Sequence, residues 1–447
     1  MVIKKPQKPP KWEELVKKYS NFGGLFRITE AMINTHVSRG YPHWDKLRRL
    51  TPPQGLTSDQ WWFAIKISRG SQYRPVPLKD TVGRPFVFLV PDSIQENLHA
   101  IDCGAGKSQH FSEPITNPQT RDQYLIRSFV EEAITSSQLE GAVTTREVAK
   151  EMILSGRAPR DTSEQMILNN YLTMRRIVDI KDQEMTPELV FNLHRLVTEK
   201  TLDKFSAAGR FRYTFEKRVV ADMEGEVYHE PPDVKELMNR LEAMCNFANQ
   251  KTPSYFIHPV VRGIILHFWL AYDHPFVDGN GRTARSLFYW AMLHYGYSLF
   301  EFISISSILR KAPVKYARSF LYTESDDNDM TYFILYQTEV IHRAIEELHT
   351  YIDKKSVELQ QLQSEIKVLQ NFNHRQVALL RHALKHPIQE YTIEGHQQSH
   401  NVAYQTARTD LLKLHEYELL EHKKRGKAMV FYVPPDLANR LRRLSIS

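Results

Sequence analysis

His274-Pro275-Phe276-Val277-Asp278-Gly279-Asn280-Gly281-Arg282-Thr283-Ala284-Arg285 is the stretch that decides the fold. Upstream, residues 260–272 have the apolar composition of a buried helix, and residues 286–297 have the same character downstream. Pro275 and the closely spaced glycines are not compatible with a helix interior. The sequence therefore predicts a tight loop that joins two buried helices.

This loop has the features of an anion-binding site. Glycines on both sides of an asparagine allow the backbone amides of residues 279–281 to point inward as an anion nest. We expect the second helix to begin at Arg282, so that its positive dipole end faces the same point. Arg282 and Arg285 are three residues apart and share a helix face. The pattern favours a loop that holds phosphate groups.

Two further residues of the loop supply chemistry. Asp278 is a hard oxygen ligand of the kind that binds magnesium together with phosphate oxygens. His274 can accept a proton near neutral pH. Taken singly, a histidine beside a helix end is more often structural, and a Gly-Asn-Gly loop is usually a turn. A base, a carboxylate and two arginines in one loop instead predict phosphoryl or nucleotidyl transfer.

With the pattern His-Pro-Phe-x-Asp-Gly-Asn-Gly-Arg-x-x-Arg, the segment resembles the signature of Fic (filamentation-induced by cAMP) domain proteins, and every signature position is filled. The resemblance covers roughly residues 125–337 and includes Gly209-Arg210-Phe211-Arg212 and Ser304-Ile305-Ser306. Members of this family mostly transfer AMP from Mg-ATP to a Ser, Thr or Tyr hydroxyl of a protein. The resemblance thus implies ATP as substrate, Mg²⁺ as cofactor and a protein as partner.

The resemblance also implies a role for each loop residue. His274 would deprotonate the target hydroxyl, and Asp278 would hold magnesium. Arg285 would bind the γ-phosphate, while the α and β phosphates would lie against Gly279, Asn280, Gly281 and Arg282. A hairpin around residues 219–228, called the flap below, would align the target by strand addition. Transfer of UMP, phosphocholine or phosphate is an alternative, but the complete loop favours AMP.

A second motif, Ser136-Ser137-Gln138-Leu139-Glu140-Gly141, closes a helix predicted over residues 122–140. Ser136 and Glu140 are four residues apart and share a face. A capping box that starts at Ser137 is the alternative. We discount it because Ser137 lies inside a helix already under way and Gly141 is typical of a helix stop.

The second motif is similar to the inhibitory motif of the Fic family. There the glutamate pairs with the second arginine of the loop, here Arg285, and blocks the productive position of the γ-phosphate. Because the helix precedes the core, the protein resembles a class II member that is autoinhibited by Glu140. In some relatives the same glutamate positions a water that removes AMP, so de-AMPylation, alone or beside AMP transfer, is an alternative.

The predicted fold is mainly α. Residues 121–337 show apolar residues three and four apart in six segments, 122–140, 163–179, 186–200, 233–249, 258–273 and 282–296. A hairpin around Met223-Glu224-Gly225 interrupts them, so we expect a Fic-type helical bundle with a β-hairpin flap. Residues 1–120 are interpreted as a mixed, loop-rich region. Within it, Gly104-Ala105-Gly106-Lys107-Ser108 resembles the end of a phosphate-binding loop, but Ile101 stands where that motif needs glycine, and we expect a solvated turn.

The C-terminal part is expected to be separate. Residues 338–371 are predicted to form a charged helix that serves as a spacer or as the arm of a homodimer. Residues 372–447 follow the pattern of a winged helix-turn-helix: helix 374–385, a strand near 391–393, helices 395–401 and 403–416, and strands 418–422 and 428–433 around the basic turn Lys423–Lys427.

Charge and polar side chains make DNA a candidate partner for this part. Residues 371–447 carry 12 Lys or Arg and 7 Asp or Glu, a net charge of +5. Side chains in or near the second and third helices could reach base edges, namely Gln398, Ser399, Tyr404, Gln405, Thr406, Arg408 and Thr409. A protein-binding winged helix is the alternative, and DNA is slightly favoured.

Composition is that of a globular protein. The chain has 447 residues, 42% hydrophobic and 25% charged, and a net charge of +7 that permits an anionic partner without requiring one. Two cysteines are too few for a disulfide framework or a thiolate zinc site. No apolar run is long enough to cross a membrane, and residues 1–18 lack a signal-peptide core. We expect a cytoplasmic protein with no membrane partner.

Two classes of function fit these observations. One is an enzyme that transfers AMP to a protein hydroxyl. The other is a DNA-binding regulator in which the Fic domain senses nucleotide. The intact His274 favours the enzyme, because a sensor needs no base.

Overall fold

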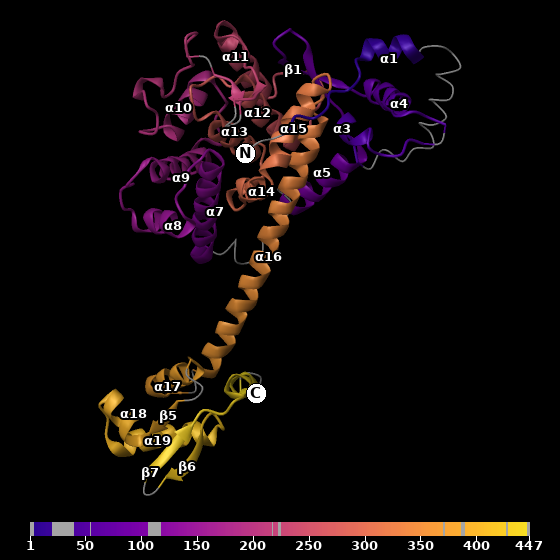
Figure 1. Cartoon of the computed structure of the whole chain (residues 1–447). Coiled ribbons are helices and arrows are strands. Elements are labelled where there is room, and N and C mark those ends of the chain that lie inside the picture. The colour runs from indigo at the N-terminus through magenta and orange to yellow at the C-terminus, as the bar shows by residue number, and fades with distance from the viewer. Residues whose placement is uncertain are drawn as a thin grey trace. The chain divides into compact units, whose positions relative to one another are not determined.

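A computed structural model gives the architecture of the chain (Figure 1). It describes residues 4–19, 40–53, 55–105, 118–216, 218–221, 225–369, 372–385, 389–425 and 428–444. The chain divides into two compact units, Met1–His349 and Thr350–Ser447. The segments 1–120 and 121–337, which we expected to differ in character, lie in the same unit.

The N-terminal part of the first unit is richer in regular structure than expected. It contains helices α1 (Trp12–Tyr19), α3 (Trp44–Leu47), α4 (Ser58–Gly70) and α5 (Asp92–Ala105), and an antiparallel hairpin of β1 (Arg74–Lys79) and β2 (Pro85–Phe88). In α4, Thr57 and Gln60 form a capping box. This box and the buried aromatic side chains of α4 explain why an aromatic-rich, proline-flanked stretch is helical.

The turn expected at Gly104 is wrong, because Gly104 and Ala105 close helix α5. That helix buries Ile94, Leu98, Ile101 and Ala105 at helical spacing. A Cβ atom at Gly104 would lie 2.9 Å from the side chain of Ile345, so glycine here allows a close approach between helices. The other three residues of the candidate phosphate loop, Gly106, Lys107 and Ser108, lie outside the described residues.

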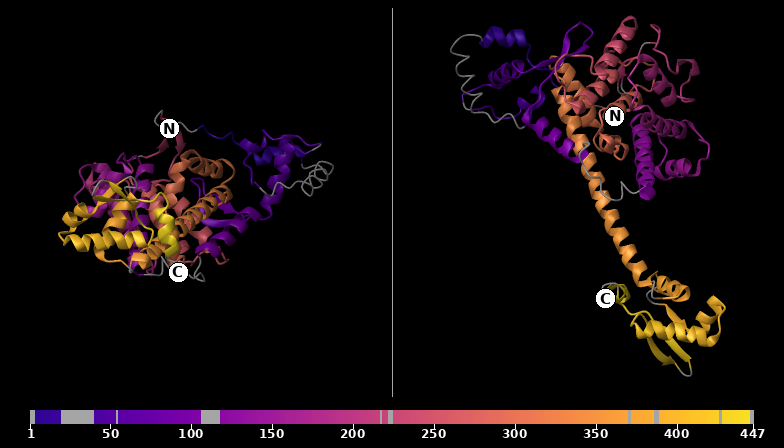
Figure 2. Two further views of the ribbon diagram at one scale, coloured as in Figure 1. Left: turned by 90° about the horizontal axis from the view of Figure 1, so that it is seen from below. Right: turned by 180° about the vertical axis from the view of Figure 1, so that it is seen from behind.

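Helices dominate the rest of the first unit, as predicted (Figures 1 and 2). They are α7 (Pro118–Leu139), α8 (Arg146–Ser155), α9 (Thr162–Ile180), α10 (Pro187–Val197), α11 (Leu237–Ala248), α12 (Pro259–Asp273), α13 (Asn280–His294), α14 (Ile305–Lys311) and α15 (Pro313–Ser325). Pro187 and Pro259 stand in the first turns of α10 and α12, where the missing N–H has no helical partner to lose. The expectation of a mainly helical fold is confirmed.

Helices α12 and α13 pack against each other and are buried over most of their length. Helix α13 begins at Asn280, two residues earlier than predicted. Between α10 and α11 the chain forms the short antiparallel strands β3 (Val220–Ala221) and β4 (Val227–His229), at the position of the predicted flap. Its turn residues Met223 and Glu224 lie outside the described residues.

Helix α16 (Thr331–Leu369) begins in the first unit and contains most of the charged segment predicted over 338–371. The second unit continues with α17 (His374–Lys385), β5 (Glu390–Thr392), α18 (Ile393–His400), α19 (Tyr404–Glu416), β6 (Glu421–Arg425), β7 (Ala428–Tyr432) and α20 (Leu437–Leu444). Its three strands form an antiparallel sheet in the order β5-β7-β6. The unit has its own apolar core, to which both the helices and the sheet contribute.

Two details of the second unit differ from the sequence expectation. Strand β6 begins at Glu421 because Glu418 takes a left-handed conformation, with a φ of 59°, and closes a turn after α19. Lys423, Lys424 and Arg425 therefore lie in the strand, while Gly426 and Lys427 lie outside the described residues. Assignment as a winged helix-turn-helix stays a prediction, which the order of helices and strands supports. In the described part of the chain, helices are either too short or too polar to span a lipid bilayer.

Candidate active site

The loop between α12 and α13 has a tightly determined backbone. His274 ends α12 in a left-handed conformation, with φ 42° and ψ 53°, and its N–H donates to Leu270 O. Gly279 precedes α13 with φ 81°, and a Cβ atom there would lie 2.5 Å from the side chain of Thr198. Only glycine satisfies both the positive φ and this close approach.

Side chains from inside and outside the loop hold it in place. Asn280 is buried, and its amide accepts from Phe276 N–H and donates to Phe276 O, both at 2.9 Å. From α10, His194 stacks on Phe276 at 3.7 Å. The ring of His194 accepts from Gly209 N–H and donates to Asp278 O, both at 2.9 Å. Burial lowers the pKa of His194 to about 4, so the ring is neutral as these bonds require. No motif around His194 predicts this role.

Arg282 and Asp278 form one pair at the start of α13. Arg282 is fully buried, donates to Val197 O at 2.9 Å and lies 3.3 Å from the Asp278 carboxylate. Its Nε has no partner among the described residues. The side chain of Asp278 is 58% exposed, so one carboxylate oxygen is available to solvent or a cation. A magnesium ion that keeps water and phosphate ligands needs no more than one or two such carboxylates.

Arg285 pairs with the predicted inhibitory motif. Its Nε donates to Ser136 Oγ at 2.8 Å, and its terminal nitrogen donates to Ser136 O at 3.0 Å and to Glu140 Oε1 at 2.9 Å. Arg285 is almost completely buried, whereas the Glu140 side chain is 28% exposed. The pair therefore lies at the wall of a cavity, with the carboxylate toward the open side.

The Glu140 carboxylate also lies directly against the loop. A Cβ atom at Gly281 would be 2.2 Å from Glu140 Oε1. The carboxylate thus occupies space next to the backbone amides that we expected to bind phosphates. Helix α7 stops at Leu139, and Gly141 has a φ of 98°, the conformation of a helix terminator. This stop directs Glu140 out of the helix and toward Gly281.

His274 is held as a neutral base. Burial, with the nearby charge of His229, lowers the pKa of His274 to about 4. Its Nδ1–H donates weakly to Ala271 O at 3.4 Å. In that tautomer Nε2 carries a lone pair, and no described side chain bonds to it. His274 can therefore accept a proton at neutral pH.

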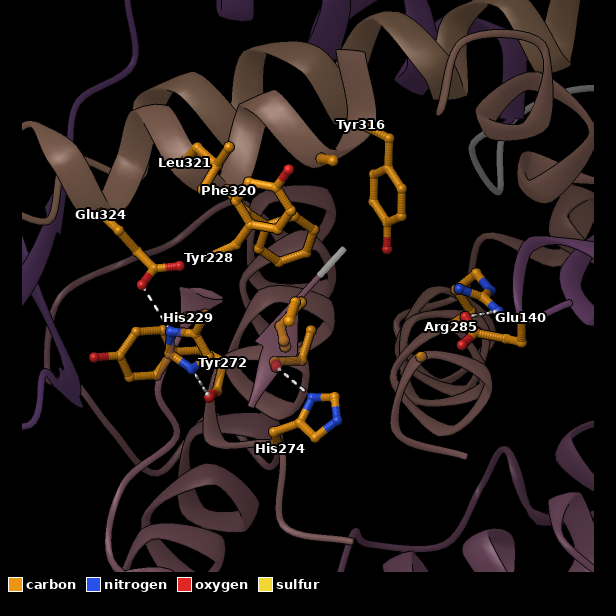
Figure 3. Close-up of a pocket in the computed structure, with 15 residues that line it drawn as sticks. Glu140, Tyr228, His229, Tyr272, His274, Arg285, Tyr316, Phe320, Leu321 and Glu324 are labelled. Carbon is orange, nitrogen blue, oxygen red and sulfur yellow. Dashed lines mark hydrogen bonds and ion pairs between the residues drawn. The ribbon is translucent and has the colours of Figure 1, made fainter. Parts of the chain in front are cut away.

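These groups meet in a pocket of about 280 Å³ (Figure 3). Glu140 and Arg285 lie at one end, Glu324 and His229 at the other, and His274 between them. The wall that faces His274 is largely apolar and comes from β4 and α15, with Tyr228, Tyr316, Ala317, Phe320 and Leu321. Tyr228 lies within the predicted flap, whereas nothing in the sequence marks the four wall residues of α15, because the apolar face of this helix looks like any core face.

Of the predicted site residues, His274, Gly281, Arg285 and Glu140 line this pocket together. Ser136 reaches it only through Arg285. Gly279, Asn280 and Arg282 are buried and are not among the residues that line the pocket, and Asp278 faces solvent. In the described residues there is no group of three or more His, Cys, Asp or Glu side chains arranged to hold a metal.

The sequence profile of the Fic/DOC family matches residues 184–292, which include α10, the flap and the whole loop. These residues form a Fic domain. The resemblance noted from the loop motif is thereby confirmed at the level of the domain. The profile match ends before α14 and begins after α7, so it includes neither Glu140 nor the C-terminal unit.

Known proteins that resemble this chain share the Fic domain. The chain is 27% identical over 178 residues to the protein adenylyltransferase Fic of Nematostella vectensis, covering 40% of this chain and 39% of the relative. It is 27% identical over 247 residues to that of Drosophila erecta, covering 54% and 46%. The chain thus matches less than half the length of these relatives.

A solved structure, a Fic family protein from Desulfovibrio desulfuricans G20, matches with a TM-score of 0.55 at 19% identity. The match covers 77% of this chain and 97% of that protein. At this identity the likeness shows the fold, and it supports the Fic-type helical bundle described above.

Proposed function

We propose that this protein transfers AMP from Mg-ATP to a hydroxyl side chain of a target protein or of itself, and that Glu140 inhibits the reaction. One observation carries the proposal: Glu140 pairs with Arg285 and lies over Gly281, in the same pocket as the neutral His274. The relatives named protein adenylyltransferase support the reaction class.

In the proposed reaction, the target oxygen forms a bond to the α-phosphorus, the bond between the α and β phosphates breaks, and pyrophosphate leaves. His274 Nε2 takes the hydroxyl proton. The backbone of residues 279–281 and the guanidinium of Arg285 bind the phosphates, with Arg282 supporting the loop from behind. Magnesium, held by Asp278, would neutralise phosphate charge. The open edge of β3 would pair with the target segment.

Autoinhibition follows from competition for one place. A carboxylate and a phosphate are both attracted to Arg285 and to the backbone amides beside Gly281. Because both are negatively charged, they repel each other when they are bound side by side. While Glu140 stays, the γ-phosphate cannot reach Arg285. ATP then binds in a position from which the α-phosphorus is not presented to the target hydroxyl.

Self-labelling with ATP labelled on the α-phosphate tests the proposal. We expect Glu140→Gly to incorporate much more label than the wild type, and Glu140→Gly/His274→Ala to incorporate none. Glu140→Gly/His342→Ala is the matched control, because His342 is a half-exposed histidine on α16. Equal labelling of the wild type and Glu140→Gly would refute the inhibition, and undiminished labelling without His274 would refute the assignment of the base.

Removal of AMP is the second candidate function. It is favoured by the position of the Glu140 carboxylate, which faces the same pocket as His274 and could orient a water molecule there. AMP-modified protein incubated with the wild type would then lose its label, and Glu140→Gly would not remove it. The same assay with both proteins separates the two directions.

For the second unit we propose DNA binding through α18, α19 and β6. Six of the seven polar side chains singled out above are exposed, Thr406 being half-buried, and Lys423 and Lys424 are exposed on β6. Ser399 and Thr409 bond back to their own helices, so Gln398, Tyr404, Gln405 and Arg408 are the better candidates for base contacts. A DNA-binding regulator with a nucleotide-sensing Fic domain remains the competing account of the whole protein.

A further inference from the structure

Helix α7 meets α13 in a regular antiparallel register. Glu132 and Ser136 on α7, and Glu140 just after its last residue, follow one another at intervals of four residues, and their partners on α13 run in the opposite direction. Glu132 accepts from Tyr289 OH at 2.8 Å, Ser136 Oγ accepts from Arg285 at 2.8 Å, and Glu140 lies against Gly281. The inhibitory contact is therefore the last of three contacts on one face.

Glu132 is the most completely bonded of the three residues. Its side chain is buried, and its oxygens accept from Ser304 Oγ at 2.8 Å, Ser306 N–H at 3.0 Å and Ser306 Oγ at 2.5 Å, besides Tyr289 OH. Four donors, together with the charge of the nearby Arg285, offset the cost of burying this carboxylate. Donors fixed on two elements, α13 and the start of α14, leave the carboxylate one position.

A cluster of apolar side chains joins α7 to α8 and α9 rather than to α13. Val130, Ala133 and Ile134 pack with Ala149, Met152 and Ile167 from α8 and α9. These apolar contacts hold α7 to α8 and α9, whereas Glu132 and Ser136 bond to α13 and to the start of α14. A change at Glu132 should leave the α7–α9 packing in place and weaken the attachment to the Fic domain.

We propose that Glu132 is a positioning residue for the inhibitory helix: its bonds to Tyr289, Ser304 and Ser306 set the register that places Glu140 over Gly281. Glu140 lies eight residues further along the chain, just past the end of α7, which is about 12 Å at 1.5 Å per residue. A slip of one helical turn, about 5.4 Å, would remove Glu140 from the loop. The inference deepens the autoinhibition proposed above and rests on it.

The test compares four full-length variants with the wild type: Glu132→Ala, Glu140→Gly, the double variant, and Glu131→Ala. Glu131 is the matched control, because it is the neighbouring glutamate on α7 and binds Arg146 at the surface. Two quantities are measured, self-labelling from ATP and hydrogen exchange of the peptide that covers residues 133–140. We expect Glu132→Ala to raise labelling at least roughly ten-fold, since the loss of even one of its four hydrogen bonds changes an equilibrium by about that factor.

In the double variant we expect the labelling of Glu140→Gly with no further rise, because both changes act through the same contact. Exchange across residues 133–140 should increase in Glu132→Ala and stay at the wild-type level in Glu131→Ala. Unchanged labelling in Glu132→Ala beside a rise in Glu140→Gly would overturn the inference. So would a loss of labelling when Glu132→Ala is added to Glu140→Gly, since Glu132 would then support the active site itself.

The two proposals fail differently. If Glu140→Gly does not raise labelling, the proposed autoinhibition is wrong, and this inference, which rests on it, is overturned with it. Hydrogen exchange then still reports whether Glu132 holds α7: unchanged exchange in Glu132→Ala would show that it does not.

Discussion

At the scale of single residues, the loop uses its glycines for two different physical reasons. Gly279 is needed for its positive φ of 81° and its contact with Thr198. Gly281 has ordinary helical backbone but no room for a Cβ atom beside the Glu140 carboxylate. The first glycine shapes the loop, and the second leaves room for the Glu140 carboxylate, whose place we propose a phosphate takes during the reaction.

Substitution of Gly279 by alanine should therefore lower the free energy of unfolding by more than backbone strain alone would. Gly83, in the β1–β2 turn, has a similar φ of 86° and open space around it, so Gly83→Ala isolates the strain. We expect a loss of about 1 kcal/mol for Gly83→Ala and about 3 kcal/mol or more for Gly279→Ala, where a side chain must also move. Urea unfolding measures both, and equal losses would show that the Thr198 contact has no effect.

At the scale of elements, a histidine attaches the flap to two helices. His229 of β4 lies 2.7 Å from the Glu324 carboxylate of α15 and 2.6 Å from Tyr272 O at the end of α12. Both partners are acceptors, so both ring nitrogens must carry a proton. Burial opposes this, but Glu324, with Asp273 and Tyr272 O, raises the pKa of His229 above 6.5. The flap is thus held by an imidazolium ion.

The flap attachment should depend on pH in a defined direction. Because the folded-state pKa exceeds the unfolded one, the stabilisation is complete below about pH 6.5 and is lost as the pH rises through the folded value. NMR titration of His229 should give a pKa above 6.5, which Glu324→Gln should lower. A value at or below 6.5 in the wild type would contradict the double hydrogen bond.

Elements marked by residues with strong local backbone preferences could be predicted from the sequence. Features that depend only on packing between distant segments could not. The α12–α13 loop and the stop at Gly141 follow from proline, glycine and asparagine, whose backbone preferences are local. The bonds of His194 and Glu132 join residues 84 and 174 positions apart, and the apolar wall depends on α15 lying opposite the α12–α13 loop. No single sequence distinguishes such contacts from ordinary core residues.

At the scale of the whole molecule, the chain has two compact units with separate apolar cores. The first holds the Fic domain and its proposed inhibitor. The second carries most of the excess positive charge, which lies within its last 77 residues, and it has exposed lysines on β6. This division fits an enzyme whose target or location is selected by a separate part of the chain.

Binding of the second unit to DNA should depend strongly on salt. A salt series against random duplex DNA should give a falling affinity, with a slope of about 0.9 per phosphate contact. Lys423→Ala/Lys424→Ala should lower that slope by about two, and Lys150→Ala, on an exposed position of α8, should not change it. If no binding to DNA is detected even at low salt, the DNA proposal is wrong and the alternative, a unit that binds a protein, is favoured.

Mass spectrometry of peptides from a cell lysate incubated with ATP, Mg²⁺ and the Glu140→Gly variant tests the central claim most directly. We predict AMP on Ser, Thr or Tyr hydroxyls of one or a few proteins, and no such peptides with Glu140→Gly/His274→Ala or with the wild type. Modified peptides that carry phosphate or another nucleotide, or AMP that appears without His274, would contradict the account.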